Sequence, residues 1–306
     1  MTRSATWFDL QVNGYAGVDF NQDRLTAENL HRACKRLRAD GVGQILATII
    51  TEDLSTMCGR IATLARLREQ DPLARRVIAG LHVEGPFLSP LAGFRGAHPA
   101  DAIRAADENA ARQLVAAGAG LVRLVTLAPE QDPGFRVTRW LARQGVVVAA
   151  GHTDASRDQL QGAVDAGLTM FTHLGNGCPG QLARHDNIVQ RALSLADRLW
   201  LCFIADGIHI PFFALRNYLR LAGLGRCVVV TDAMAAAGLG PGRYTVGRWD
   251  LLVGADLAAR APDGSHLVGS AMTLQQSVEN LVQQVGLQPA EAVRLVRRNP
   301  RQALER

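Results

Sequence analysis

Four residues with metal-binding or proton-transferring side chains stand at the ends of short apolar runs. Glu84, His152 and His173 each come at or just after the end of such a run, and Asp232 follows the run 228–230. One carboxylate and two imidazoles supply three ligands to a borderline cation such as zinc and leave a position for water. We therefore expect Glu84, His152 and His173 to hold one divalent cation.

A centre of this kind can hydrolyse a carbonyl compound. Water on the cation ionises near neutrality, and the hydroxide attacks a carbonyl that the same cation polarises. A nearby carboxylate must take the proton of the water and later deliver it to the departing amine. Asp232 is placed for that role, so the sequence predicts a metal-dependent hydrolase of an amide bond.

Each of these residues also has an ordinary structural interpretation. A single His at a strand end is more often a hydrogen-bonded structural residue than a ligand, and Asp232 could cap a helix that begins at Ala233. Glu84 is harder to explain in this way, because a carboxylate at the end of an apolar run is costly to bury unless it is paired or coordinated. His82 shares the strand face of Glu84 by alternation, and we interpret it as polar support in the core.

Positioning these residues requires strands that end at one place. Short β-branched or apolar runs alternate with longer helical patterns, which is typical of repeated βα units. The expected strands are residues 7–12, 43–50, 77–83, 121–126, 146–150, 169–172, 200–204 and 226–230. Helical spacing occupies residues 26–40, 54–70, 105–117, 156–166, 211–221, 271–285 and 289–298, and the last pattern stops near Asn299-Pro300.

Eight units of this size predict an α/β fold of the (β/α)8 TIM type, in which catalytic groups lie at the carboxyl ends of the strands. An open doubly wound sheet is the competing architecture. We expect a single catalytic domain over residues 1–306. Segment 235–268 interrupts the last unit with glycine, proline and short β-like pieces, and it is expected to form an excursion over the barrel mouth.

The composition excludes several other classes of protein. The formal charge of +5 comes from arginines spread along amphipathic helices, so no nucleic acid is expected as a partner. No apolar run approaches the roughly 20 residues that cross a bilayer, and the start of the chain lacks a signal-peptide pattern, so we expect a cytoplasmic protein without a membrane partner. The five cysteines are scattered without a C-x-x-C pair, which argues against disulfides and a structural zinc site.

Short motifs at the expected strand ends resemble those of the N-acetylglucosamine-6-phosphate deacetylases of the amidohydrolase superfamily. The match spans nearly the whole chain, and its motifs stand in the family's order. They are Asp9-Leu10-Gln11-Val12-Asn13-Gly14, His82-Val83-Glu84-Gly85-Pro86-Phe87, Gly96-Ala97-His98, Gly151-His152-Thr153, Thr172-His173-Leu174, Asp206-Gly207-Ile208-His209, Thr231-Asp232-Ala233 and Gly269-Ser270-Ala271.

The resemblance implies a role for each matching residue. Glu84, His152 and His173 would bind the metal, with zinc favoured and iron, manganese or cobalt also compatible, and Asp232 would act as general base and then acid. His98 would polarise the acetamide carbonyl. The sugar phosphate would be held by Asn176, the backbone around Gly177, His209 and, across the interface of a homodimer, Arg184. An exposed loop position remains the alternative for His98, and a turn position for Asn176.

Three departures from the family pattern bear on the substrate. The small β-sandwich that usually accompanies the barrel is not expected from the residues present. The segment after His173 reads Leu-Gly-Asn-Gly-Cys-Pro, where the family more often has a bulky aromatic before the Asn and Ala-Met after it, which predicts a wider pocket. Arg184 is followed by His185-Asp186-Asn187 in place of the usual Glu-Pro-Gly, which weakens the expected contact of Arg184 with phosphate.

The expected reaction is removal of the acetyl group from N-acetylglucosamine 6-phosphate, giving glucosamine 6-phosphate and acetate. One alternative is a deacylase of another N-acyl amino sugar, phosphorylated or not. A second alternative is a barrel that binds an amino sugar without turnover. The complete set of expected ligands and the Asp232 carboxylate favour an enzyme.

The residues also predict how many metal ions are bound. Many members of the superfamily use a His-x-His pair on the first strand and a carbamylated lysine between two metals. Here the first-strand positions are Gln11 and Asn13, and Lys35, the only lysine among 33 basic residues, lies in a helical pattern away from any strand end. We therefore expect one tightly held metal ion per chain, measured by elemental analysis of the active protein. Two ions per chain would contradict this prediction.

Overall fold

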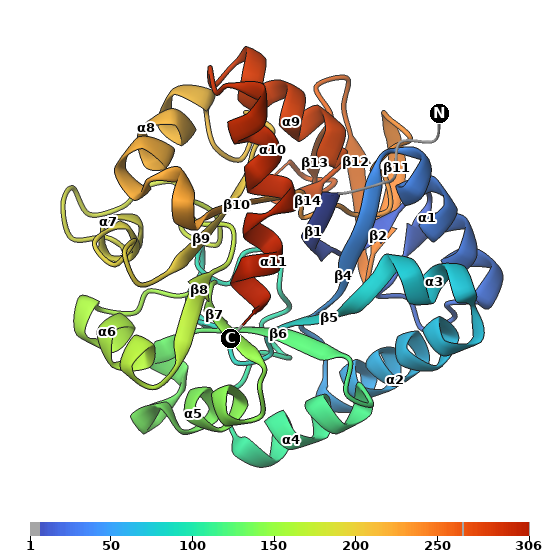
Figure 1. Ribbon diagram of the computed structural model, residues 1–306. Coiled ribbons are helices and arrows are strands. Elements are labelled where there is room, and N and C mark those ends of the chain that lie inside the picture. Colours follow the sequence, from blue (N-terminus) through green and yellow to red (C-terminus); the bar gives the residue numbers. More distant parts are fainter. Residues whose placement is uncertain (1–6, 265, 306) are drawn as a thin grey trace.

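The computed structural model describes residues 7–264 and 266–305. Eight parallel strands form one sheet that curls around a central axis, and each pairs with the next one along the chain (Figure 1). They are β1 (Trp7–Val12), β4 (Val42–Ile50), β5 (Ile78–Glu84), β6 (Val122–Leu127), β7 (Val147–Ala150), β8 (Leu168–Phe171), β9 (Trp200–Ile204) and β10 (Cys227–Val230). The eight strands expected from the sequence and the (β/α)8 barrel are confirmed, and the doubly wound alternative is wrong.

Helices surround this barrel (Figure 1). The expected ones are α1 (Ala27–Ala39), α2 (Leu54–Gln70), α4 (Glu108–Ala117), α6 (Arg157–Asp165), α8 (Phe212–Ala222), α9 (Leu274–Gln283) and α10 (Pro289–Arg297). The sequence analysis did not single out α3 (Pro72–Val77), α5 (Arg136–Arg143), α7 (Ile188–Leu193) and α11 (Asn299–Leu304), or the 3-10 turns Pro129–Gln131, Pro133–Phe135 and Leu224–Arg226. Short helices of six to eight residues carry too few turns for a clear apolar period.

The C-terminal boundary agrees in part with the sequence. The helix expected over 289–298 stops before Asn299-Pro300, since α10 ends at Arg297, but a further helix, α11, runs from Asn299 to Leu304. Proline is tolerated in the first turn of a helix, because the N–H that it lacks has no partner within the helix there. Asn299 is buried and donates to the carbonyls of Leu224 and Cys227, at 2.8 and 2.6 Å, which docks the start of α11 under the barrel.

Apolar side chains fill two layers on either side of the strands. Inside the barrel they form one cluster, made of Phe8, Leu10, Leu46, Leu124, Val147, Ala149, Met170, Cys202, Ile204, Val228 and Val230. The alternate residues of the same strands face outward and pack against the helices in a larger cluster. The barrel is therefore closed below by side chains, and polar groups collect at its other end.

The segment after β10 forms a separate antiparallel sheet. Its strands pair in the order β11 (Gly242–Val246), β12 (Trp249–Val253), β13 (Ala258–Arg260) and β14 (Leu267–Ser270). A two-stranded ribbon, β2 (Gly14–Tyr15) and β3 (Val18–Asp19), follows β1. That residues 1–306 make up a single catalytic domain stays a prediction. Along the described ranges, no helix has the length and apolar character needed to cross a membrane.

Candidate metal centre and active site

The side chains expected to do chemistry stand where barrel strands end. Glu84 is the last residue of β5, while His152, His173 and Asp232 each come two residues after the end of β7, β8 and β10. These last three residues have positive backbone φ angles of 50°, 30° and 52°. A left-handed backbone conformation is unfavourable for residues other than glycine. It recurs at functional sites, where it turns a side chain away from the path of the strand.

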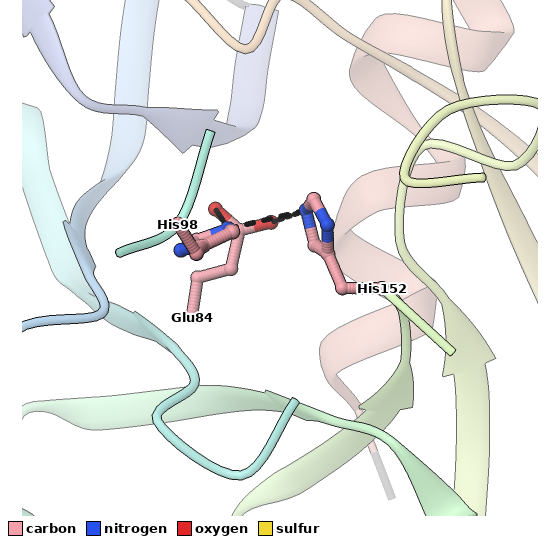
Figure 2. Close-up of side chains that lie close together, drawn as sticks. All are labelled: Glu84, His98 and His152. Atoms are coloured by element: carbon pink, nitrogen blue, oxygen red, sulfur yellow. Dashed lines mark hydrogen bonds and ion pairs between the residues drawn. The ribbon is translucent and has the colours of Figure 1, made fainter. Parts of the chain in front are cut away.

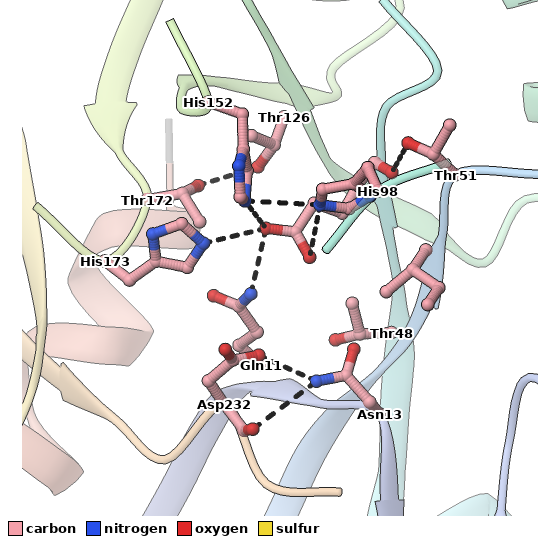
Figure 3. A network of polar contacts seen from close by, with 12 residues as sticks. Gln11, Asn13, Thr48, Thr51, His98, Thr126, His152, Thr172, His173 and Asp232 are labelled. Carbon is pink, nitrogen blue, oxygen red and sulfur yellow. Dashed lines mark hydrogen bonds and ion pairs between the residues drawn. The ribbon is translucent and has the colours of Figure 1, made fainter. Parts of the chain in front are cut away.

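The Glu84 carboxylate is the meeting point of three imidazoles (Figures 2 and 3). Its Oε1 lies 2.9 Å from Nε2 of His173 and 3.4 Å from Nε2 of His152, and its Oε2 lies 4.0 Å from Nε2 of His98. Gln11 also donates to Oε1, over 3.1 Å. Burial alone would raise the pKa of Glu84, but its close contacts with His152 and His173, the latter a 2.9 Å hydrogen bond, lower it well below its usual range, so the carboxylate is ionised.

His152 is held with Nε2 directed at Glu84. Its Nδ1 lies 2.9 Å from the carbonyl of Phe94, which fixes Nδ1 as the protonated nitrogen and leaves Nε2 as an acceptor. Gly96 and Gly177 pack on the ring, and a Cβ added to either would come within 3.0 and 2.8 Å of it. Both glycines also have positive φ angles, so their replacement would strain the backbone and displace the imidazole.

His98 comes from the long loop after β5 and contacts the same cluster (Figure 2). Its Nε2 lies 3.2 Å from Nε2 of His152. Because the His152 nitrogen is an acceptor, the His98 nitrogen must be the donor. Burial, with the neighbouring His152, lowers the pKa of His98 to about 3, so this ring is neutral at physiological pH. A neutral imidazole with its N–H aimed into the site can polarise a carbonyl.

The chemistry of these donors fits a divalent cation. Glu84, His98 and His152 offer ligand atoms that all lie within 4.8 Å of one another, and His173 reaches the same carboxylate from another side. One carboxylate with imidazoles suits zinc and neighbouring transition metals. Two sets of three ligands are therefore compatible with the geometry: the expected Glu84, His152 and His173, or Glu84 and His152 with His98.

Polar residues under this cluster support it from within the barrel. Nε2 of His82 lies 2.8 Å from Oγ1 of Thr126, which is in turn 2.7 Å from Oγ1 of Thr172. The Oγ1 of Thr51 donates to the backbone carbonyl of Glu84 over 2.9 Å (Figure 3). Burial lowers the pKa of His82 to about 4, which keeps the ring neutral. This arrangement agrees with the expected role of His82 as polar support.

Asp232 faces the cluster from the last strand of the barrel (Figure 3). Its Oδ1 accepts a 2.7 Å hydrogen bond from the amide nitrogen of Asn13, and Oδ2 has no hydrogen-bond partner among the described residues. Burial and the negative charge of Glu84 raise the pKa of Asp232 to about 6. A carboxyl group with such a pKa can both accept and release a proton near neutrality.

A cavity of about 720 Å³ opens above these residues. Its lining includes all of the expected site residues except Arg184, which is exposed on the loop that follows the cavity wall. The excursion contributes Val246, Leu267 and Val268 to the wall, and Gly269 directly follows it. Cys178 and Pro179 also line the cavity.

Sequence reasoning missed several residues of this lining, above all Arg95, Tyr218 and His266. Arg95 is the one arginine among the lining residues within the described ranges. Its position directly before the Gly96-Ala97-His98 motif is the signal that could have drawn attention to it. Tyr218 lies within α8, where an aromatic residue is indistinguishable from helix packing until the tertiary structure is known.

His209 lies at another part of the cavity lining and is oriented by a carboxylate. Its Nδ1 is 2.6 Å from Oδ2 of Asp206, and Oδ1 of Asp206 accepts the backbone N–H groups of Ile208 and His209. Burial raises the pKa of Asp206, but these hydrogen bonds outweigh it and hold the pKa below the usual value. The ionised Asp206 therefore accepts the Nδ1–H of His209 and fixes the orientation of the ring at the cavity wall.

Comparisons with known proteins agree with this geometry. No family model matches the chain. An N-acetylgalactosamine-6-phosphate deacetylase from Escherichia coli O157:H7 is 32% identical over 97% of this chain and 77% of its own length. An N-acetylglucosamine-6-phosphate deacetylase from Bos taurus is 33% identical over 97% of this chain and 73% of its own.

Solved structures give the same result at the level of the fold. A mutant N-acetyl-D-glucosamine-6-phosphate deacetylase from Mycobacterium smegmatis, in complex with N-acetyl-D-glucosamine-6-phosphate, superposes with a TM-score of 0.89 at 33% identity. The match covers 98% of this chain and 77% of that one. With its barrel, its strand-end motifs and these relatives, the chain belongs to the family of N-acetylglucosamine-6-phosphate deacetylases.

Proposed function

We propose that this enzyme hydrolyses the acetamide of N-acetylglucosamine 6-phosphate to glucosamine 6-phosphate and acetate. The observation that carries the proposal is the convergence of Glu84, three imidazoles and Asp232 in one cavity. This set provides a place for a cation, a donor to a carbonyl and a carboxylate that can move a proton. Hydrolysis of a linear amide bond needs these three functions.

We assign the metal to Glu84, His152 and His173, and we favour zinc, although iron, manganese and cobalt suit the same donors. A divalent cation supplies a Lewis acid that polarises a carbonyl and acidifies water. The assignment of His173 rests on its short contact with Glu84, 2.9 Å from Nε2 to Oε1, against 4.0 Å from Nε2 of His98 to Oε2. His98 is kept for the substrate because the Nε2–H that it directs at the cluster is a donor.

Asp232 moves the proton in this proposal. Asn13 holds its Oδ1, so Oδ2 is the oxygen available to accept a proton from the attacking water. The same oxygen can then deliver that proton to the departing amine, which must be protonated to leave. His98 donates its Nε2–H to the acetamide oxygen as negative charge develops there. Burial keeps His98 neutral and so preserves this donor.

The phosphate end of the substrate is proposed to meet His209 and Arg95. Asp206 orients the ring of His209 through Nδ1, and the guanidinium of Arg95 makes no hydrogen bond or ion pair with the described residues. Asn176 and the backbone at Gly177 line the same cavity and would bind the sugar. Arg184 lies outside the lining, so its contribution depends on a second copy of the chain in a homodimer.

The identity of the amino sugar is the narrower part of the proposal. One relative is named for N-acetylgalactosamine 6-phosphate and others for N-acetylglucosamine 6-phosphate, so a deacylase of another N-acyl amino sugar stays the second candidate. The observation in its favour is the cavity wall, where Gly177 and Cys178 replace the usual Ala-Met. The homodimer and a cytoplasmic location stay predictions.

A panel of N-acetylated sugars and their 6-phosphates tests the function. We expect acetate release to be fastest with N-acetylglucosamine 6-phosphate, and Asp232→Asn to reduce kcat at least about 100-fold because it removes the proton acceptor. The metal content of this variant should remain that of the wild type. Preference for unphosphorylated sugars would contradict the roles of His209 and Arg95, and an active Asp232→Asn variant would contradict the proton transfer.

The two possible ligand sets differ in which histidine variant should lose the metal. We expect His173→Ala to lower metal content and affinity strongly, while His98→Ala keeps one ion per chain but lowers kcat, because His98 acts on the substrate. Elemental analysis and competition with a chelator measure both quantities. His31→Ala is the control, since this exposed His lies away from the cavity. Loss of metal in His98→Ala but not in His173→Ala would assign the ion to the other set.

The acidic limb of the pH profile of kcat/KM should lie above the pH at which an ordinary aspartate titrates. Asp232 must be unprotonated to accept a proton, so kcat/KM falls as pH falls through its pKa. Burial, the main cause of its pKa of about 6, persists when a cation neutralises Glu84, so we expect the limb between about pH 4 and 6. Asn13→Ala removes a hydrogen bond that lowers this pKa and should move the limb upward. Metal content is measured at each pH, and a limb at or below the ordinary value of 3.8 at constant metal content would contradict the role of Asp232.

A further inference from the structure

The barrel has a seam where its first and last strands meet. Backbone ladders join the strands in order from β1 to β10, and within the described ranges no ladder joins β10 to β1. One bridge joins Val12, the last residue of β1, to Ala233, which lies beyond the end of β10, and there the N–H of Asn13 donates to the carbonyl of Ala233 over 2.7 Å. Other groups must therefore hold the strands together below this bridge.

The carboxylate of Asp9 spans the seam. Asp9 lies in β1 and is only 1% exposed. Its Oδ2 accepts the hydroxyl of Thr231 over 2.6 Å, and its Oδ1 accepts the backbone N–H groups of Thr231 and Gln11, each over 3.2 Å. The hydroxyl oxygen of Thr231 accepts the N–H of Ala233 over 3.0 Å. The Thr231 hydroxyl also contacts the carbonyl of Gln11 over 3.4 Å. The side chains of Asp9 and Thr231 thus supply the cross-strand bonds that a backbone ladder supplies elsewhere.

This placement is costly for an acidic residue. The hydrogen bonds that Asp9 accepts come from uncharged donors, two N–H groups and a hydroxyl, and burial raises its pKa to about 7. An apolar residue at this position would avoid that cost but would leave the N–H groups at the seam without acceptors. The reason for an acidic residue at this position therefore lies in the functional residues that flank the seam.

Residues of the proposed reaction stand on both sides of the seam. On the β1 side, Gln11 donates to Oε1 of Glu84 over 3.1 Å. On the β10 side, Asp232 directly follows Thr231 and has a φ of 52°, a strained conformation that its neighbours must maintain. Asn13, which follows β1, donates a hydrogen bond across the seam to Oδ1 of Asp232 (Figure 3). A shift of β10 against β1 would therefore move Asp232 relative to Glu84.

We propose that Asp9 is a positioning residue that closes the barrel seam through Thr231 and thereby fixes Asp232 beside the Glu84 cluster. This inference rests on the proposed proton transfer by Asp232. It concerns the rate of the chemical step, because the residues that line the cavity for the sugar and phosphate do not include Asp9 or Thr231. A displacement of about 1 Å at a reacting group costs on the order of 100-fold in rate.

The experiment uses paired variants of the two partners in the metal-loaded enzyme. Asp9→Ala removes all three bonds, whereas Asp9→Asn keeps the acceptor for both N–H groups and offers its amide to the Thr231 oxygen. Thr231→Val removes the hydroxyl at nearly constant volume, whereas Thr231→Ser retains it. We expect kcat to fall about 100-fold in Asp9→Ala and about 10-fold in Thr231→Val, with KM and metal content within about threefold of the wild type. Asp9→Asn and Thr231→Ser should recover most of kcat.

A matched control separates positioning from general loss of stability. Asp132 is equally buried and accepts the N–H groups of Val137 and Thr138, at 3.1 and 2.8 Å, but it does not line the cavity. Asp132→Ala should lower the urea midpoint about as much as Asp9→Ala does and leave kcat unchanged. Hydrogen exchange of residues 227–234 in the metal-free protein should be faster in Thr231→Val than in Thr231→Ser, which reports on the seam without activity.

Three results would contradict the positioning role of Asp9. Wild-type kcat in folded Asp9→Ala or Thr231→Val, a change confined to KM or metal content, or an equal loss of kcat in Asp132→Ala would each overturn the inference. If Asp9→Ala does not fold, the two Thr231 variants decide. Asp232→Asn keeps the two proposals apart: if that variant is active, the proton transfer itself is wrong, whereas if only the seam variants are active, the positioning role alone fails.

Discussion

The buried carboxylate of Glu84 is the group around which the site is built. A lone ionised carboxylate in a barrel mouth would be strongly destabilised, so donors must surround it. The structure provides donors from two strands, Gln11 from β1 and His173 from the end of β8, and places His152 from the end of β7 beside them. Each donor has to approach from a different direction, and a closed ring of parallel strands is a fold that allows this.

Holding those donors in place requires unfavourable backbone conformations. His152, His173 and Asp232 all adopt positive φ angles, at a cost of order 1 to 3 kcal/mol each. Close packing by glycine at residues 96 and 177, together with the carbonyl of Phe94, leaves the His152 ring one position. The surrounding barrel maintains this local strain, because apolar side chains pack tightly on both faces of its sheet.

The antiparallel sheet after β10 has a different role from the barrel. It contributes an apolar wall to the cavity and is anchored at the turn after β11, where the N–H of Gly247 donates to Asp19 over 2.7 Å and Arg248 pairs with Glu52 and Asp101. Asp101 belongs to the same long loop as His98. The wall of the cavity and the loop that carries the carbonyl donor are therefore joined by one arginine, which links the shape of the pocket to its chemistry.

The sequence by itself determined the barrel and most of the site. Eight apolar runs of strand length, each followed by a polar strand end, are a local pattern, and so are motifs such as His82-Val83-Glu84. Other features depend on contacts between distant segments. The position of His98 beside His152, the presence of Arg95 and Tyr218 in the cavity, and the bond from Asp9 to Thr231 join residues far apart in the chain. Local composition carries no record of such pairs, because a buried Asp in a strand or a Tyr in a helix looks the same until the closing of the barrel decides which side chain it faces.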